Sequence, residues 1–244
     1  MNKSKEQLLK SFKKIKSKGW VESLRKGPTG IGYTFEQLLS LPENNLSIPD
    51  YNEIEIKTKR FYTKGNITLF STVPDGDEIF PLKKLCKNFG YPDKEFPQFN
   101  ILNISIQSNN YTNIGLYKKF KLKINNSEKK IQIEAINNQK IDNSTSWSYE
   151  LLEKTLTRKI SYLAIVKAHS KFYESKEFFK YSSIKFYKLK DFDTFIRLLE
   201  KGIIRLTIKI GIHKTHDRLG QIKCHGCSFD IHENNIEQLF LRIE

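Results

Sequence analysis

Residues 49–60 read PDYNEIEIKTKR, and within this stretch charged residues alternate with the apolar Ile54 and Ile56. Alternation with a period of two is typical of a strand that is buried on one face. The pattern therefore predicts a strand over residues 53–59, in which the isoleucines share the buried face and the charged residues share the other.

The charged face of this strand brings carboxylates and an amine together. Glu55 and Lys57 are two residues apart, so their side chains point the same way, about 7 Å apart. Asp50 precedes the strand by a turn that begins at Pro49, and its carboxylate can reach toward Glu55. Two carboxylates suit Mg²⁺, and a metal-bound water beside a lysine is the equipment for phosphodiester hydrolysis. Taken alone, however, such a pattern is more often a solvated strand face with salt bridges.

The composition indicates a globular, basic protein. Its 244 residues, 38% of them hydrophobic and 12% aromatic, are enough for one large domain or two lobes around a core. Lys and Arg number 42 against 27 Asp and Glu, and the net charge of +15 favours a polyanionic partner such as a phosphate backbone. Charge alone does not separate DNA from RNA or from an acidic membrane surface.

The sequence also indicates the cellular compartment of the protein. No apolar run approaches the roughly 20 residues that span a bilayer, and the N-terminal stretch has no apolar signal-peptide core. The 3 cysteines do not make a disulfide framework. We therefore expect a soluble protein of the cytoplasm that does not bind a membrane.

Periodicity predicts a mixed α/β (α+β) fold. Helices are expected over residues 4–17, in a short segment capped by Thr34, over 149–159, and over 192–199 with Asp191 as the N-cap. Strands or buried apolar segments are expected, besides 53–59, over 67–73, 116–124, 130–136, 160–168 and 203–213. Residues 74–112 are rich in Pro, Gly, Asn and Asp and are expected to be excursions from the core. The pattern changes near residue 145, which predicts two lobes, 1–145 and 146–244; a single sheet that crosses both lobes is the alternative.

Several stretches together resemble a known nuclease family. They are GPTGIGYTFEQLL (27–39), PDYNEIEIKTKR (49–60), TLFSTVP (68–74), IDNSTSWSYELLEKTLTRKISYLAIV (141–166), IKIGIH (208–213) and HG (225–226). Jointly they resemble the MvaI/BcnI group of restriction endonucleases, with spacing most similar to the MvaI branch, and more distantly the mismatch-repair nickase MutH. All belong to the PD-(D/E)xK superfamily, and the resemblance covers most of the chain.

The resemblance implies roles for residues around the strand at 53–59. Asp50 and Glu55 match the metal ligands of the family, and Lys57 matches its motif lysine. Glu36, in GYTFE, matches a further acidic residue that a helix carries near the metal, and the main-chain carbonyl of Ile56 matches another ligand. The metal implied is Mg²⁺, with Mn²⁺ as a substitute, and the lobe 1–145 would hold this catalytic core.

The resemblance also implies that the lobe 146–244 reads double-stranded DNA from the major groove. The candidate contacts lie on the polar face of the strand at 203–213 and in the loop after it: Arg205, Thr207, Lys209, His213, Arg218 and His225. Basic side chains there fit guanine edges, but they fit phosphates equally well, which would position the protein without specifying sequence.

The chain departs from the family pattern in this lobe. Thr207 and Lys209 stand where related lobes tend to carry an acidic residue and an arginine, and Asp230 stands where a basic residue is expected. Arg and Lys are not interchangeable at a bidentate contact. The resemblance therefore supports the cleavage chemistry better than it supports a particular recognition site. A CC(A/T)GG-like sequence is only a starting point for identifying that site.

One alternative concerns the cysteines. His213 and His216 followed by Cys224 and Cys227 have the spacing of four zinc ligands. Buried thiols are the favoured interpretation, because the family match accounts for the histidine at 225 without a metal.

The function expected from the resemblance is that of a type II restriction endonuclease. It would act as a monomer that cuts one strand at a time with Mg²⁺, and a cognate DNA methyltransferase would protect host DNA. Two alternatives stay open: a MutH-like mismatch-repair nickase, and a non-catalytic basic DNA-binding protein in which the acidic strand is structural.

Overall fold

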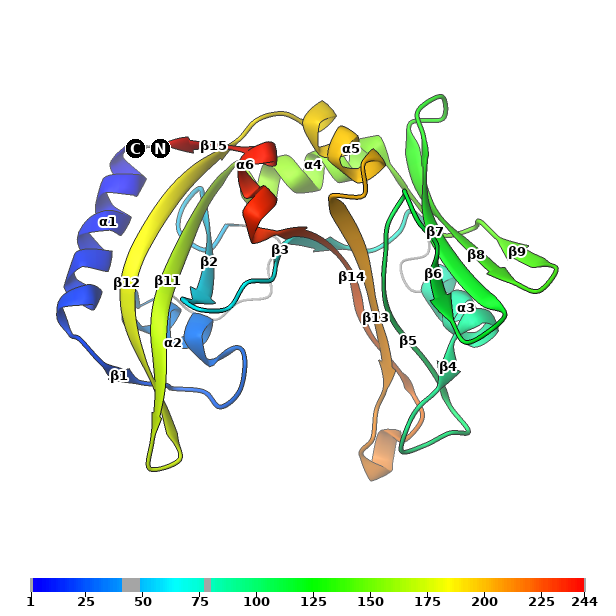
Figure 1. Ribbon diagram of the computed structural model, residues 1–244, viewed down its shortest axis with the longest axis horizontal. Helices are drawn as coiled ribbons and strands as arrows, with labels where there is room; N and C mark the ends of the chain where they lie inside the picture. Colours follow the sequence, from blue (N-terminus) through cyan, green and yellow to red (C-terminus); the bar gives the residue numbers. More distant parts are fainter. Residues whose placement is uncertain (1, 41–48, 77–79, 244) are drawn as a thin grey trace. The chain divides into compact units, whose positions relative to one another are not determined.

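The computed structural model describes residues 2–40, 49–76 and 80–243 (Figure 1). The chain divides into two compact units, and each is assembled from separate segments. Unit 1 comprises Met1–Gly65, Leu156–Lys190 and Ile236–Glu244, and unit 2 comprises Asn66–Thr155 and Asp191–Asn235. These units differ from a division at residue 145, because the chain leaves unit 1 after Gly65 and later returns to it twice. The assignment of a catalytic and a recognition role to two lobes stays a prediction.

The sheet of unit 1 follows the order β1-β12-β11-β2, with β15 paired to β12. Its strands are β1 (Val21–Glu22), β2 (Ile54–Arg60), β11 (Tyr162–Tyr173), β12 (Lys176–Leu189) and β15 (Phe240–Ile243). Strand β2 runs parallel to β11, so that Glu55 lies opposite Leu163 and Lys57 opposite Ile165. The predicted strand at 53–59 is therefore confirmed, and it lies at one end of the described strand order.

Helices cover one face of this sheet. They are α1 (Asn2–Ser17) and α2 (Gly30–Leu38), while the short α6 (Ile236–Leu239) precedes β15. One apolar core joins α1 and α2 to the sheet, and it includes Leu8, Phe12, Ile15, Phe35, Ile54, Ile56, Ala164, Val166 and Ala168. The isoleucines of β2 thus bury the face that the alternation predicts.

One detail of α2 differs from the expectation. Thr34 lies inside the helix rather than at its N-cap, and its hydroxyl oxygen accepts a hydrogen bond from the amide of Leu24 at 2.9 Å. The helix begins at Gly30, one turn earlier than the spacing of its apolar residues indicates. The threonine therefore ties the preceding loop to the helix.

Unit 2 contains two further sheets. The first has the order β3-β14-β13-β5-β4, and the second has the order β10-β8-β7-β6 with β9 paired to β8. The strands of the first are β3 (Asn66–Thr72), β4 (Tyr91–Pro92), β5 (Asn100–Ile106), β13 (Ile204–Ile212) and β14 (Ile222–His232). The strands of the second are β6 (Thr112–Ile114), β7 (Lys118–Asn125), β8 (Lys130–Asn137), β9 (Lys140–Asp142) and β10 (Ser146–Ser148).

Three further α-helices are α3 (Phe80–Phe89), α4 (Tyr149–Ile160) and α5 (Phe192–Glu200). In α5, the Asp191 side chain accepts a hydrogen bond from the Thr194 amide at 2.6 Å, which confirms the predicted N-cap. Gly202 follows the helix with φ of 68°, a conformation that glycine adopts at little cost.

The expectation for residues 74–112 was wrong. This segment contains α3 and β5, and Leu82, Leu85, Leu102 and Ile106 are among the most deeply buried side chains of unit 2. Short apolar segments separated by Pro- and Asn-rich turns show too little periodicity to reveal a helix or a strand. The core of unit 2 therefore includes a segment that the sequence pattern assigns to loops.

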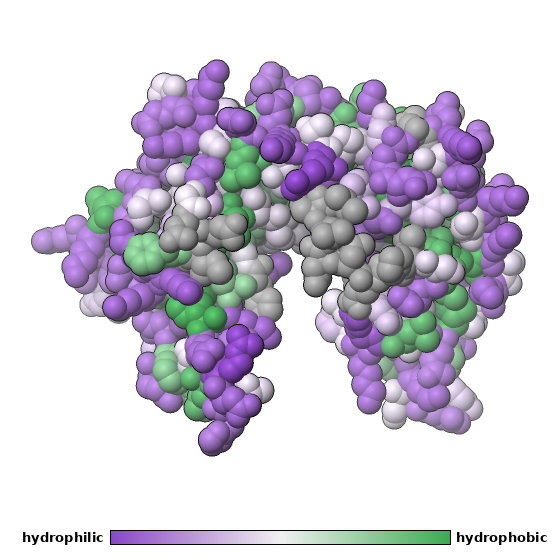
Figure 2. All heavy atoms as spheres, turned by 180° about the vertical axis from the view of Figure 1, so that it is seen from behind, coloured by the Kyte–Doolittle hydropathy of each residue, from purple (hydrophilic) through white to green (hydrophobic). Residues whose placement is uncertain are grey.

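The surface is mainly polar. Figure 2 shows that hydrophilic side chains cover most of the face in view, with smaller hydrophobic patches between them. Among the described residues, no helix is long and apolar enough to cross a membrane.

Candidate active site

The carboxylate of Glu55 is buried, which distinguishes it from the acid of a solvated strand. Its side chain is 1% exposed, while the Lys57 side chain is 26% exposed. Ile54 and Ile56 hold β2 against the helices, so Glu55 and Lys57 point to the opposite face of the sheet. A buried charge must be compensated by nearby groups of opposite charge or by hydrogen bonds. The groups around Glu55 therefore determine whether its carboxylate can be ionised.

Two lysines supply that compensation. Lys57 Nζ lies 2.5 Å from Glu55 Oε1, and Lys159 Nζ lies 3.0 Å from Oε2. Lys159 comes from the last turn of α4, directly before β11, the strand that pairs with β2. Sequence reasoning missed this residue; its one available signal was a lysine at the end of a helix that leads into a buried strand.

The electrostatics of Glu55 reflect competing effects. Burial raises the pKa of its carboxyl group, the Lys57 ammonium lowers it, and the neighbouring Asp50 carboxylate raises it. Burial has the largest effect, so the pKa of Glu55 lies above its ordinary value even between two lysines.

Asp50 lies at the outer edge of β2. Its Oδ2 accepts a hydrogen bond from the main-chain amide of Ile56 at 2.9 Å. The turn between them is closed by Tyr51 and Ile54, whose amides and carbonyls exchange hydrogen bonds of 3.0 and 2.9 Å. Within a strand the N–H and C=O of one residue point to the same side, so the Ile56 carbonyl faces the edge where Asp50 lies.

These groups fit a hard divalent cation. Asp50, Glu55 and the Ile56 carbonyl offer oxygen donors, and the buried Glu55 Oε2 is paired with the Lys159 ammonium at 3.0 Å. Nowhere in the described chain do three His, Cys, Asp or Glu side chains gather as a metal cage. A site with few protein oxygens is what Mg²⁺ uses, because this ion retains several waters.

Glu36 lies where α2 packs against β2, and it is half-buried. A Cβ added at Gly32, one turn earlier, would come within 3.2 Å of Thr58 Oγ1 and 3.8 Å of Glu36 Oε1. The Glu36 charge also raises the pKa of the buried Tyr181, after burial itself. Glu36 is thus placed beside the strand that carries Lys57, and its role at a metal stays a prediction.

The chain as a whole is similar to known proteins. The sequence model of the MvaI/BcnI restriction endonuclease family matches residues 9–240. The chain belongs to this family.

Solved structures of MvaI agree with this assignment. A restriction endonuclease MvaI–cognate DNA substrate complex is 32% identical, with a TM-score of 0.89, and the match covers 98% of this chain and 96% of that one. MvaI in the absence of DNA is 30% identical, with a TM-score of 0.63 and coverage of 100% and 98%. A comparison with curated proteins finds no match. The predicted family and mixed fold are confirmed, and the chain is a type II site-specific deoxyribonuclease.

In this MvaI/BcnI-family chain, the predicted recognition strand is β13. Its residues alternate strictly: Leu206 and Ile208 are fully buried, while Thr207 is half-buried and Lys209 is exposed. The hydroxyl groups of Thr207 and Ser105 lie 2.8 Å apart. The strand therefore brings Arg205, Thr207 and Lys209 onto one face, as predicted.

The other predicted contacts surround the hairpin between β13 and β14. His213 is half-buried at the end of β13, and the exposed Arg218 donates from Nε to Gln221 Oε1 at 3.3 Å. The side chain of His225 lies outside the described residues. Which of these groups contact bases or phosphates stays a prediction.

Asp230 of β14 has a structural role. It is 5% exposed and lies opposite Arg205 in the strand register. It accepts hydrogen bonds from the hydroxyl groups of Thr68 at 2.6 Å and Ser228 at 3.2 Å. An acidic residue at this position thus links β14 to its neighbour β3.

The three cysteines are all in unit 2 and form no disulfide. Burial raises the pKa of Cys86 to about 11, and burial also raises the pKa of Cys227. Cys86 Sγ donates to the Asn100 carbonyl at 3.4 Å. Buried thiols of this kind are poor nucleophiles and behave as small hydrophobic groups.

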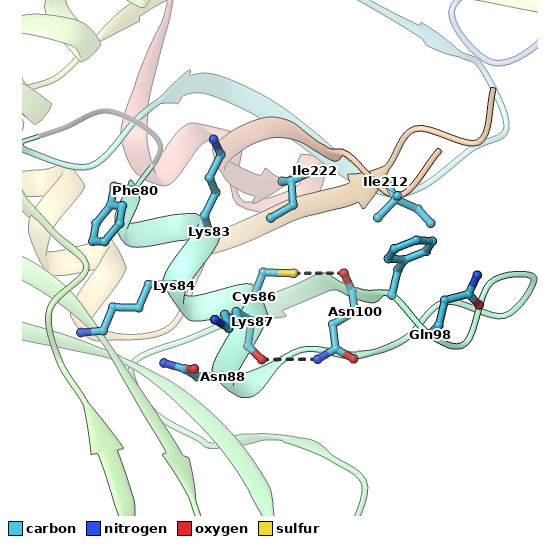
Figure 3. A pocket seen from close by; sticks show the side chains of 12 residues that line it. Phe80, Lys83, Lys84, Cys86, Lys87, Asn88, Gln98, Asn100, Ile212 and Ile222 are labelled. Carbon is cyan, nitrogen blue, oxygen red and sulfur yellow. Dashed lines mark hydrogen bonds between the residues drawn. The ribbon is translucent and has the colours of Figure 1, made fainter. Parts of the chain in front are cut away.

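A cavity of about 720 Å³ lies beside Cys86, between α3 and the ends of β13 and β14 (Figure 3). Cys86, Ile212 and Ile222 form apolar lining, and Lys83, Lys84 and Lys87 come from the same helix. None of its described lining residues is Asp, Glu or His. The described lining of the cavity therefore offers no carboxylate or imidazole to a metal ion.

Proposed function

We propose that this endonuclease uses Mg²⁺, with Mn²⁺ as a substitute, to hydrolyse phosphodiester bonds at a short site in double-stranded DNA, one strand at a time and as a monomer. The observation that carries the proposal is the buried Glu55 carboxylate, held between two lysines next to Asp50. Burying a carboxylate costs free energy, and a strand that is only structural gains nothing from a buried acid beside a partly exposed lysine.

Each residue of the cluster has a distinct task in the proposal. Asp50, Glu55 and the Ile56 carbonyl hold the metal, and Glu36 supports it from α2. The metal supplies polarisation of the phosphodiester and a bound water of lowered pKa. Lys57, whose ammonium is 2.5 Å from Glu55 and partly exposed, orients the attacking water and stabilises negative charge that develops on the phosphate.

The target is read by the polar face of β13 and the hairpin that follows it. Arg205, Thr207 and Lys209 lie on one face of the strand, and His213, Arg218 and His225 lie in or near the hairpin. The exposed Lys209 is the best placed of the strand residues to reach a base edge or a phosphate. A cognate methyltransferase that modifies the same site would protect host DNA.

Digestion of unmethylated plasmid DNA tests the proposal. Discrete ends are expected with Mg²⁺ or Mn²⁺, none with EDTA, and none with Asp50→Ala. Sequencing the ends gives the site and the cut position. The nicked circle should appear before the linear product, because one active site cuts one strand at a time.

Two results would contradict the proposal. Cleavage of equal rate in EDTA would exclude the metal mechanism. Nicked circles that never become linear in the purified protein alone would favour a mismatch-repair nickase that needs a second protein.

A further inference from the structure

The face of the unit 1 sheet that carries Glu55 and Lys57 continues past them as a row of lysines and rings. On β2, Lys59 and Phe61 follow Lys57 at intervals of two residues. On β11, Lys167 lies opposite Lys59. Residues two apart in a strand, and their neighbours across a parallel pair, point to the same face. The opposite face, with Ala168 in the core, packs against the helices.

Phe61 remains aligned with the sheet although it follows the last residue of β2. Its amide donates to the Ala168 carbonyl at 2.8 Å, and its ring stacks on His169 with centroids 4.5 Å apart and an interplanar angle of 21°. Lys167 Nζ lies 5.9 Å from the centre of the same ring. Lys59, Phe61, Tyr62, Lys167 and His169 are called the aromatic–lysine row below.

Tyr62 is the most exposed member of this row. Its side chain is 82% exposed, against 43% for Phe61. It nevertheless has a defined place, since its ring makes edge contacts with Phe61 at 5.3 Å and His169 at 5.6 Å between centroids. A single exposed ring is common, but three adjoining rings on the catalytic face, with lysines between them, form an organised surface.

The chemistry of the row matches nucleic acid. Lysines neutralise phosphates, and aromatic rings pack on nucleobases and sugars without regard to sequence. Phe61 lies four residues from Lys57, about 13 Å along an extended strand. That length equals about four base-pair steps at 3.4 Å each.

We propose that the aromatic–lysine row is a second DNA-contact surface, which grips the duplex a few nucleotides from the scissile bond. Lys59 and Lys167 contact phosphates, and the Tyr62 ring packs on a deoxyribose or base edge. The row supplies affinity and positions the strand over Lys57, whereas β13 reads the sequence. This inference rests on the proposed role of the Glu55–Lys57 face in cleavage.

Fluorescence anisotropy with a labelled mixed-sequence duplex tests the row, with Ca²⁺ in place of Mg²⁺ so that DNA is not cut. Tyr62→Ala is expected to weaken binding about tenfold, and it should leave the salt slope unchanged because it removes an uncharged packing contact. Tyr62→Phe keeps the ring and should bind like the wild type. Lys167→Ala should weaken binding and lower the slope of log K against log salt by about one.

Lys13→Ala is the matched control, because Lys13 is exposed on α1, the helix that packs on the other face of the sheet. It should change neither the affinity nor the slope by as much as Lys167→Ala. Wild-type affinity for both Tyr62→Ala and Lys167→Ala, in protein with unchanged thermal stability, would overturn the inference.

A second variant separates this inference from the proposed function. Lys57→Ala should abolish cleavage and keep binding. If it does so while the Tyr62 and Lys167 variants bind normally, only the row is refuted. If Lys57→Ala still cleaves, the assignment of the catalytic face itself fails.

Discussion

Lys159 is the residue that sequence patterns alone did not reveal at the site. Its ammonium lies 3.0 Å from Glu55 Oε2, and its side chain is 17% exposed. A carboxylate this deeply buried is costly without nearby positive charge. We infer that Lys159 is a positioning residue that keeps Glu55 ionised and fixed in orientation while Lys57 acts beside it.

Replacement of Lys159 by alanine should therefore affect both stability and metal binding. Loss of this partner leaves Oε2 buried and uncompensated, and we expect the free energy of unfolding to fall by about 1–3 kcal/mol. Affinity for Ca²⁺, measured by calorimetry, should fall as well. Arg158→Ala, an exposed neighbour in the same helical turn, is the control and should change neither quantity appreciably. Equal behaviour of the two variants would show that Lys159 is dispensable.

The raised pKa of Glu55 predicts a pH dependence of stability in metal-free buffer. The folded protein binds the proton more tightly than the unfolded chain, whose pKa stays near 4.5. The free energy of unfolding attributable to Glu55 is therefore highest below that value. It falls as the pH rises from 4.5 toward the raised pKa, and then levels off.

Urea unfolding of the wild type and Glu55→Gln over this pH range measures the effect. Because the glutamine cannot ionise, the wild type should lose stability relative to the variant as the pH rises. A difference that grows in favour of the wild type with rising pH would mean that the lysines outweigh burial and that the pKa is lowered.

Helices and strands with strong sequence periodicity could be predicted, whereas short apolar segments could not be assigned to a helix or a strand. The alternation of β2 and β13 and the cap of α5 are in the structure as the sequence predicts. The burial of Glu55 could not be read in advance, because it depends on α4 and β11, which meet β2 only after a long intervening segment. Alternation identifies the face of a strand, but not whether another element covers it.

The N-cap of α5 offers a stability test at this scale. Asp191→Ala removes the acceptor for the Thr194 amide, and we expect a loss of about 1 kcal/mol. Asp193→Ala, within the first turn of the same helix, keeps that hydrogen bond and should cost less. Thermal unfolding of both variants gives the comparison, and equal losses would argue against the cap.

Strand β13 permits a test of how DNA is read. Lys209 is exposed on the polar face, opposite Asn103 of β5. If its main contact is to a phosphate, Lys209→Ala should weaken binding to all duplexes alike and lower the salt slope by about one. Thr207→Ala should leave the slope unchanged, since threonine carries no charge. A Lys209 variant that cleaves altered sites with an unchanged slope would instead indicate a base contact.

For the whole molecule, the amino-acid composition predicted the class of binding partner, but the sequence did not predict how the chain is divided into units. A net charge of +15 agrees with membership in a DNA-cleaving family. The arrangement of the two units did not follow from any local pattern, because each unit is assembled from segments that are distant in the chain. Only long-range pairing, such as β2 with β11, determines which segments belong together.

If the Glu55–Lys57 face of β2 is the cleavage centre, Lys57→Ala should remove cleavage and keep DNA binding. The measurement is single-turnover cleavage of the identified site in Mg²⁺, with binding of the same duplex measured in Ca²⁺. Cleavage should fall by at least about a hundredfold, as expected for removal of a group that stabilises transition-state charge, while binding should stay within a few-fold of the wild type. Cleavage at the wild-type rate by the folded variant would show that the chemistry takes place elsewhere in the chain.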